Sequence, residues 1–331
     1  MTQPEPRRPT MTDVLEARAV VQRYLPRTPL HPCPALAELL GAAEVRLKHE
    51  DHHALGAFKV RGGVNLAAHL SPEERRRGMV TASTGNHGQS IAYAGRLTGV
   101  PVTVYVPRGA NPLKAAAMRR LGAEVVEHGA IFEDAREEAE RVAREEGMRY
   151  VHPCNEPLLI AGVATSTLEV LEEFPQVDAI VLPAGAGTGA SGACIVAKTL
   201  RPQVQVFAVQ SEQAPAAYLS WREGRIVEAP VRTFAEGIAT RIGYELPQSI
   251  LRDLLDDFVL VSDEEIKAAV GLLLEQAHTL AEGAGAAALA GALRLRPRLA
   301  GRNVVIVVSG ANITVETLQE CLAVYLARRE G

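Results

Sequence analysis

Residues 179–192 read AIVLPAGAGTGASG. The first five residues form an apolar run of strand length, and the glycines lead toward a helix predicted over 193–200. Glycines between a strand and a helix let backbone N–H groups gather around an anion at the helix N-terminus. No Gly-Lys-Ser/Thr follows, so this is not a Walker A loop. The stretch predicts a phosphate cradle, with a tight turn that binds no ligand as the alternative.

Similar apolar runs alternate with longer helical patterns along the whole chain. The predicted strands are 44–48, 79–83, 102–106, 124–127, 150–152, 179–183, 204–210, 258–261 and 304–308. Predicted helices include 134–146, 158–174 and 263–280. An unbroken run such as VVIVV at 304–308 is typical of a parallel strand that is buried on both faces. The alternation predicts an α/β fold with open parallel sheets.

Composition excludes several classes of function. The 331 residues carry a net charge of -4, with 47% hydrophobic residues and no block rich in Lys and Arg, so no nucleic-acid surface is expected. The longest uncharged stretch, 179–197, is broken by Pro183 and glycines, so no membrane span is expected. The four cysteines, Cys33, Cys154, Cys194 and Cys321, show no CxxC spacing. This pattern predicts a cytoplasmic protein without a disulfide framework.

A second motif, GAFKVRGG at 56–63, places Lys59 between apolar neighbours just before a helix predicted over 61–70. Both an apolar setting and a helix N-terminus lower the pKa of an amine, and a deprotonated amine can form a Schiff base. Taken alone, however, a lysine beside Phe58 is more often a surface residue whose stem covers apolar side chains.

Two further turns follow predicted strands. In STGNHGQS at 83–90, hydroxyl and amide side chains precede a helix and can bind a carboxylate or phenolate oxygen. His87 alone is more typical of a helix cap or a packing residue. In VSGAN at 308–312, Ser309 ends a buried strand, and its hydroxyl needs a partner, either a ring nitrogen or a backbone carbonyl.

In this order and spacing, the four motifs resemble the fold-type II pyridoxal-phosphate enzymes, in particular the threonine/serine dehydratase and serine racemase branch. The likeness covers about 29–327. It implies two open parallel-sheet domains, similar to tryptophan synthase β, with the cofactor in the cleft between them. Residues 1–76 and 155–331 would form the large domain, and 77–154 a small mobile domain inserted into it.

The resemblance also implies roles for individual residues. Lys59 carries the cofactor and acts in catalysis together with Thr84. The cofactor-binding residues implied are Phe58, Lys59, Asn86, Gly185, Ala186, Gly187, Thr188, Gly189, Glu282 and Ser309. Among these, Asn86 bonds the ring O3′, 185–189 hold the phosphate, and Ser309 faces the ring nitrogen. The substrate carboxylate docks on Ser83, Thr84, Gly85, Asn86 and His87.

The implied reaction is the α,β-elimination of a 3-hydroxy-L-amino acid to a 2-oxo acid and ammonia, in a homodimer. Threonine, serine, phenylserine and hydroxyaspartate stay open as substrates, because Ala57 replaces the usual Ser or Thr and because Thr84 differs from many dehydratases. An amino-acid racemase or a β-replacing synthase is the alternative on the same fold. A non-catalytic module that binds phosphate or a nucleotide is the remote alternative.

Three departures from the family pattern concern other ligands. Gln210 and Ala216 stand where some members hold Mg²⁺ or Ca²⁺ with carboxylates, so no metal site is expected there. His52 and His53 either contact substrate or lie in an exposed loop, with the loop favoured. Cys154 is interpreted as a small buried residue.

Overall fold

The computed structural model describes residues 7–330, which form two compact units. The smaller unit comprises the described residues up to Pro26 together with Lys59–Thr165. The larger unit comprises Arg27–Phe58 and the described residues from Ser166 onward. Each unit contains its own sheet, and all strand pairs but one are parallel. The predicted α/β fold with parallel sheets is confirmed.

The larger unit is built on a six-stranded sheet of order β1-β2-β10-β7-β8-β9. Its strands are β1 (Leu30–Pro32), β2 (Glu44–His49), β7 (Ala179–Pro183), β8 (Gln205–Ser211), β9 (Asp257–Val261) and β10 (Asn303–Val308). Only β1 runs antiparallel, at the edge beside β2. His49 pairs with Val308, so β2 and β10 end at the same level of the sheet. Ligands of open α/β sheets bind beyond this carboxyl edge.

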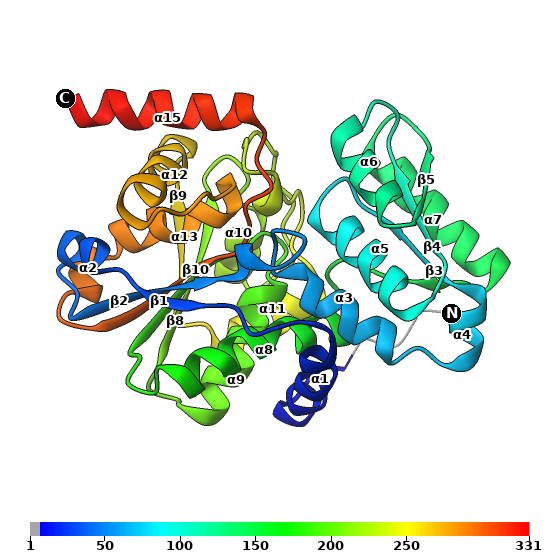
Figure 1. The fold of residues 1–331 in the computed structure, drawn as a ribbon, viewed down its shortest axis with the longest axis horizontal. Coiled ribbons are helices and arrows are strands. Elements are labelled where there is room, and N and C mark those ends of the chain that lie inside the picture. Colours follow the sequence, from blue (N-terminus) through cyan, green and yellow to red (C-terminus); the bar gives the residue numbers. More distant parts are fainter. Residues whose placement is uncertain (1–6, 331) are drawn as a thin grey trace. The chain divides into compact units, whose positions relative to one another are not determined.

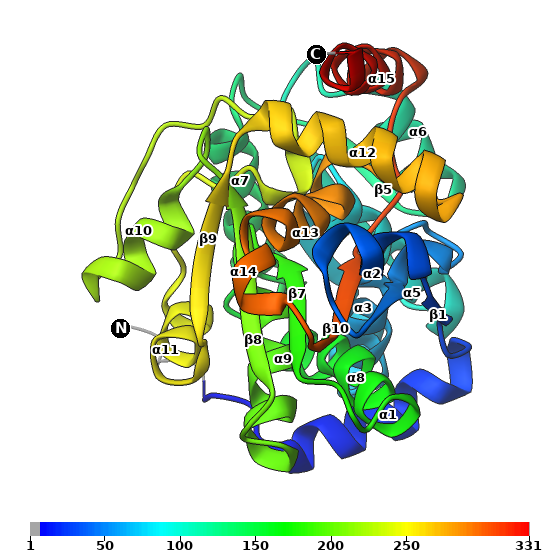
Figure 2. The ribbon, with the colours of Figure 1, turned by 90° about the vertical axis from the view of Figure 1, so that its left-hand side faces the viewer.

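Helices cover both faces of this sheet (Figure 1), because the strands are apolar on both sides. The helices of this unit are α2 (Pro34–Leu40), α9 (Thr188–Leu200), α10 (Ala216–Glu223), α11 (Glu245–Leu254), α12 (Asp263–Ala277), α13 (Gly283–Arg294), α14 (Arg296–Leu299) and α15 (Val315–Glu330), with 3-10 turns η1 (Glu50–His52) and η2 (Glu236–Ile238). Helix α13 packs on β7 and β10, and α12, which lies above α13 in Figure 2, packs on α13. The small residues of α13 allow this approach, since a Cβ on Gly291 would lie 2.3 Å from Val209.

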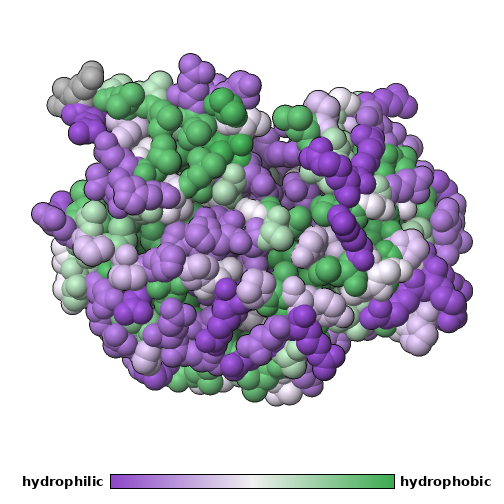
Figure 3. Space-filling model, viewed as in Figure 1, coloured by the Kyte–Doolittle hydropathy of each residue, from purple (hydrophilic) through white to green (hydrophobic). Residues whose placement is uncertain are grey.

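Part of the larger unit's surface is apolar. Figure 3 shows apolar side chains over α15 and α12, where Val315, Leu326 and Leu274 are exposed.

None of the helices described is both long and apolar enough to cross a membrane. Cys33, Cys154, Cys194 and Cys321 are all buried free thiols.

The smaller unit has a four-stranded parallel sheet of order β5-β4-β3-β6. Its strands are β3 (Met79–Ala82), β4 (Val102–Val106), β5 (Glu124–Glu127) and β6 (Arg149–Tyr150). Its helices are α1 (Met11–Tyr24), α3 (Lys59–Ala68), α4 (Pro72–Arg77), α5 (Asn86–Thr98), α6 (Pro112–Arg120) and α7 (Phe132–Glu146), while α8 (Pro157–Glu173) begins here and ends in the larger unit. Helices α3 and α5 pack closely, because a Cβ on Gly63 would lie 2.5 Å from Ser90 Oγ.

Because α3 packs closely against α5, α3 belongs to the same unit as the four-stranded sheet. The division implied by the resemblance, with a large domain (1–76 and 155–331) and a small mobile domain (77–154) inserted into it, stays a prediction.

Candidate active site

The glycine-rich loop lies at the carboxyl end of β7 in the larger unit. Helix α9 begins at Thr188, five residues before the predicted start, so Thr188 and Gly189 belong to its first turn. Gly187 precedes the helix with φ +92, a left-handed conformation that favours glycine, and no side chain caps the helix. The first-turn N–H groups of a helix have no partner within it. The loop therefore offers backbone donors to an anion.

Close packing explains why this loop has no large side chains. A Cβ on Gly185 would lie 2.9 Å from the carbonyl oxygen of Gly237 and 2.9 Å from Ile238 Cα. A Cβ on Gly189 would lie 3.3 Å from the ring of Phe58. Phe58 N in turn donates a hydrogen bond of 3.0 Å to the carbonyl of Ser309. Phe58, the residue before Lys59 in the chain, is thus held between the glycine loop and the end of β10.

Ser309 directly follows β10 and is 5% exposed. Glu282, which precedes α13, donates its backbone N–H to the carbonyl of Gly310 at 3.0 Å. A Cβ on Gly310 would lie 2.8 Å from Glu282 Oε1. The Glu282 carboxylate therefore lies against the backbone of the turn that begins at Ser309.

The segment before Lys59 is tied to the loop after β10. Ala57 and Gly310 form an isolated antiparallel bridge, and Ala311 N donates to Gly56 O at 2.9 Å. Asn312 Nδ2 donates to Leu55 O at 2.8 Å. Ala57 is 2% exposed, so its methyl group fills a buried position.

Lys59 is the first residue of α3 in the smaller unit. Its backbone carbonyl accepts a hydrogen bond of 3.0 Å from Ser90 Oγ. Burial lowers the pKa of the Lys59 amine, and the neighbouring Cys154 opposes this effect in part. A lysine with a lowered pKa is more often neutral, and a neutral amine is both a nucleophile and a base.

The turn predicted to dock a carboxylate joins β3 to α5. Ser83 Oγ accepts hydrogen bonds from Gly85 N at 3.2 Å and from Gly88 N at 3.0 Å. Gly85 precedes the helix without a side-chain cap, and Asn86 is the first helical residue. Thr84 and Asn86 are half-buried. Ser83 therefore shapes the turn, while Thr84 lies at its partly exposed side.

His87 is buried beneath this turn, and its hydrogen bonds define its tautomer. Thr81 Oγ1 donates to Val151 O at 2.8 Å and lies 3.1 Å from His87 Nε2. Since the single hydroxyl proton goes to the carbonyl, Nε2–H of the ring donates to Thr81. Nδ1 is buried without a hydrogen-bond partner among residues 7–330. Burial, followed by the charges of Lys59 and His152, lowers the pKa of His87 to about 3.

This pKa predicts a pH dependence of stability. In the unfolded chain a histidine takes up a proton near pH 6.5, whereas the folded His87 does so only near pH 3. As pH falls below 6.5, the unfolded state binds a proton that the folded state does not, so the free energy of unfolding decreases. Between pH 7 and pH 5 the loss from this residue is about 2 kcal/mol.

Urea unfolding at both pH values measures this loss. The variant His87→Gln, which retains a donor, is expected to lose about 2 kcal/mol less than the natural sequence over the same range. Equal losses in the two proteins would contradict the assigned neutral ring.

The other residues singled out from the sequence lie outside these turns. Gln210 is buried; its Oε1 accepts from Tyr218 N at 3.0 Å and its Nε2 donates to Thr240 Oγ1 at 3.2 Å. Ala216 is buried at the start of α10. Cys154 is buried, with its N–H bonded to His152 Nδ1 at 3.0 Å.

The two histidines at 52 and 53 differ. The side chain of His52 is 47% exposed, as predicted for a loop. For His53 the exposed-loop prediction is wrong, because this residue is 5% exposed and its Nε2 lies 3.3 Å from Glu50 Oε2. The buried Glu50 carboxylate accepts hydrogen bonds from Thr28 Oγ1 (2.7 Å) and Ser166 Oγ (2.9 Å). These partners lie far away in the sequence.

The sequence analysis did not identify the buried charged residues at the end of β2 and in η1. Lys48, Glu50 and Asp51 are at most 9% exposed, although charged residues are rarely buried. Lys48 Nζ lies 2.6 Å from Glu169 Oε2. The available signal was the ionic run KHED, at 48–51, directly after apolar strand residues.

These features fit pyridoxal phosphate. A loop of small residues presents backbone N–H groups suited to a phosphate, and the backbone of Gly237 and Ile238 leaves no room for a Cβ at Gly185. A lysine with a lowered pKa can bind an aldehyde covalently. Ser309 provides a neutral hydroxyl at the end of β10.

Comparisons with known proteins agree with this chemistry. The chain is 40% identical over 314 residues to an L-threonine ammonia-lyase from Thermotoga maritima, covering 95% of this chain and 78% of the relative. It is 35% identical over 309 residues to an L-threo-3-hydroxyaspartate ammonia-lyase from Saccharomyces cerevisiae, covering 93% and 94%. The crystal structure of serine racemase from Dictyostelium discoideum superposes with a TM-score of 0.88 at 32% identity, covering 93% and 99%.

A family model provides the final comparison. Residues 21–310 match the model described as "Pyridoxal-phosphate dependent enzyme". This range includes the glycine loop, Lys59, the turn at 83–87 and Ser309. The chain therefore belongs to this family of pyridoxal-phosphate-dependent enzymes.

Proposed function

We propose that this chain is an ammonia-lyase that converts a 3-hydroxy-L-amino acid to a 2-oxo acid and ammonia. The observation that carries the proposal is Lys59, an amine with a lowered pKa that directly follows Phe58, the residue packed against the glycine loop. The relatives named threonine and hydroxyaspartate ammonia-lyase support this reaction class. The cofactor is pyridoxal phosphate.

The residues that would hold the cofactor have separate tasks. The backbone N–H groups of 185–189 would bind the phosphate, with the ring of Phe58 beside this loop. Asn86 would bond the ring oxygen, and Ser309 the ring nitrogen. Glu282 braces the turn after Ser309. When bound, pyridoxal phosphate supplies an electron sink that makes the substrate Cα–H acidic.

Lys59 is the base in this proposal. Its Nζ would accept the Cα proton once the substrate amine has displaced it from the cofactor, which requires that the freed amine be unprotonated. Burial lowers its pKa and so increases the fraction of neutral amine at neutral pH. Thr84, half-buried in the carboxylate-docking turn, carries a hydroxyl that can hold a second proton.

The substrate carboxylate would be recognised without a positively charged side chain at position 87. His87 stays neutral at physiological pH, because its pKa is about 3. Binding then relies on hydroxyl groups and on the N–H groups at the start of α5, which favour an anion. Ser83 keeps these groups in place through its bonds to Gly85 and Gly88.

A substrate screen tests the proposal. The holoenzyme is incubated with L-threonine, L-serine, L-threo-3-hydroxyaspartate and L-threo-phenylserine, and 2-oxo acid and ammonia are measured. We expect equal amounts of both products from at least one of these substrates, with the largest kcat/KM for L-threonine or L-serine. Loaded enzyme that releases no 2-oxo acid from any of them would overturn the proposal.

A racemase activity is the second candidate. Serine racemase from Dictyostelium discoideum shares 32% identity with this chain, and Thr84 carries a hydroxyl in the carboxylate-docking turn. Chiral analysis of L-serine after incubation separates racemisation from elimination. If D-serine forms, Thr84→Ala should reduce its formation by about 10²-fold and reduce elimination far less. A parallel loss of both activities would assign Thr84 to a step that they share.

The expected partner is an amino-acid substrate. The homodimer and the cytoplasmic location stay predictions that rest on the resemblance and on cysteine usage. The family match removes the third interpretation, a non-catalytic phosphate-binding module.

A further inference from the structure

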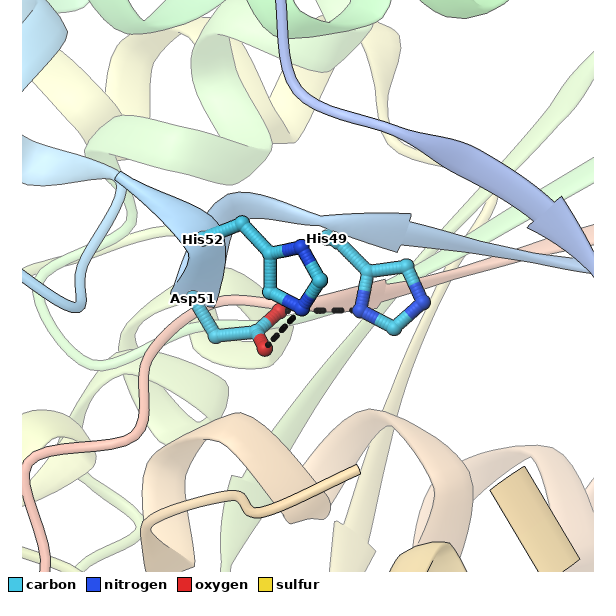
Figure 4. Close-up of side chains that lie close together, drawn as sticks. All are labelled: His49, Asp51 and His52. Atoms are coloured by element: carbon cyan, nitrogen blue, oxygen red, sulfur yellow. Dashed lines mark hydrogen bonds and ion pairs between the residues drawn. The ribbon is translucent and has the colours of Figure 1, made fainter. Parts of the chain in front are cut away.

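Two imidazoles and a carboxylate converge at the end of β2, none of which takes part in the proposed reaction. His49 is the last residue of β2, and Asp51 and His52 belong to the following turn, η1. His49 Nδ1 lies 3.2 Å from Asp51 Oδ1, and His52 Nε2 lies 3.4 Å from Asp51 Oδ2. Figure 4 shows both rings directed toward the carboxylate. One ligand atom from each residue lies within 4.8 Å of the other two.

We propose that His49, Asp51 and His52 bind one divalent transition-metal ion of the Zn²⁺ class. Zinc bonds nitrogen and oxygen at about 2.0–2.2 Å, so two ligand atoms of one ion lie at most roughly 4.4 Å apart. The separations of 3.2 and 3.4 Å satisfy this limit, and the 4.8 Å bound requires at most a small side-chain adjustment. Two imidazoles with one carboxylate suit Zn²⁺, Co²⁺ or Ni²⁺, whereas Mg²⁺ and Ca²⁺ require mainly oxygen ligands.

The surrounding structure holds the three ligands in place. The pairing of His49 with Val308 sets the end of the strand. Within η1, the side chain of Glu50 is anchored by Thr28 Oγ1 and Ser166 Oγ at 2.7 and 2.9 Å. A turn that is already ordered loses little conformational entropy when a metal binds. This pre-organisation distinguishes the group from a chance cluster of surface side chains.

Two of the three residues are buried, and the third is exposed to solvent. His49 and Asp51 are 3% and 9% exposed, so they lie in an environment that strengthens metal–ligand attraction. The His52 side chain is 47% exposed, which leaves a path for the ion and room for water in the remaining coordination positions. The metal would connect the end of β2 to η1, seven residues before Lys59, and would brace that segment.

The alternative is a hydrogen-bonded His–Asp–His cluster that binds no metal. Two measurements on tag-free holoenzyme distinguish the two, after removal of metal with a chelator and of unbound cofactor by gel filtration. Calorimetry with Zn²⁺ gives affinity and stoichiometry. The visible spectrum with Co²⁺ reports whether the ion has protein ligands. We expect one ion per chain and a rise in thermal midpoint with Zn²⁺ concentration.

Variants identify the ligands. His52→Ala removes an exposed ring, so the fold is retained, and the affinity for Zn²⁺ should fall by at least about 10-fold. Asp51→Asn keeps the side-chain shape and should cause a comparable loss. His128→Ala, which removes a histidine of the smaller unit, is the matched control and should bind as the natural sequence does.

Either of two results overturns the proposal: no binding of one ion per chain, or His52→Ala binding Zn²⁺ as tightly as the control. The retained visible band of the cofactor verifies that each variant is folded. Because binding is read without an activity assay, the outcome is independent of the proposed reaction.

Discussion

Lys59→Ala is expected to abolish 2-oxo acid formation together with the visible absorption of covalently bound pyridoxal phosphate. The variant lacks both the amine that binds the cofactor covalently and the base that accepts the Cα proton. Loss of a proton-transfer group alone costs about 10²–10⁴-fold, so the combined loss in kcat should be at least about 10⁴-fold. Absorption spectra and a 2-oxo acid assay measure both effects.

Borohydride assigns the lysine directly. Reduction of the natural enzyme should bleach the band and leave the cofactor on the peptide that contains Lys59, as mass spectrometry detects. Lys267→Ala is the matched control; Lys267 lies 3.3 Å from Glu320 in a partly exposed ion pair, which contributes little to stability. A labelled peptide elsewhere, or full activity in Lys59→Ala, would contradict the assignment.

Lys48→Ala is expected to cause the largest loss of stability. Lys48 is 0% exposed, and its Nζ contacts Glu169 Oε2 at 2.6 Å and Thr28 O at 2.8 Å. Removing the ammonium breaks this buried ion pair by deleting one of its partners, which costs about 3–5 kcal/mol. Trp221, the single tryptophan, lies in α10 of the larger unit, so its fluorescence during urea unfolding measures the loss.

A double variant tests whether apolar groups can replace this buried ion pair. Lys48→Met combined with Glu169→Leu replaces both charges by apolar groups of similar size. Because the exchange of a buried ion pair for apolar groups is often neutral or stabilising, the double variant should be more stable than Lys48→Ala. If both variants unfold at the same urea concentration, neither the broken ion pair nor the cavity in Lys48→Ala accounts for the loss, and the prediction is contradicted.

Local pattern predicted the strands well where burial on both faces produces continuous apolar runs. The predicted run at 304–308 corresponds to β10, and 102–106 and 179–183 correspond to β4 and β7. Strand β1 was missed, because three residues at a sheet edge carry too little periodicity. Its only recognisable property is its pairing with β2.

Helix starts near glycine were less predictable. The expected start of α9 was 193, whereas the helix begins at Thr188. Glycine disfavours helix by about 1 kcal/mol per residue, so local propensity argues against a helical turn containing Gly189 and Gly192. Packing of α9 on β7 and β8 overrides this preference. The earlier start matters, because it places Thr188 and Gly189 in the first turn.

Some features of the candidate site could likewise be predicted from local sequence, and others depend on tertiary contacts. Short-range pattern was sufficient to place the glycine loop, Lys59, the turn at 83–87 and Ser309 at strand or helix ends, because backbone conformation there depends on neighbouring residues. The neutral state of His87, the burial of His53, and the contacts of Lys48 with Glu169 and of Glu50 with Ser166 depend on residues up to 121 positions apart. Desolvation and ion pairing act through space, so only the tertiary structure decides them.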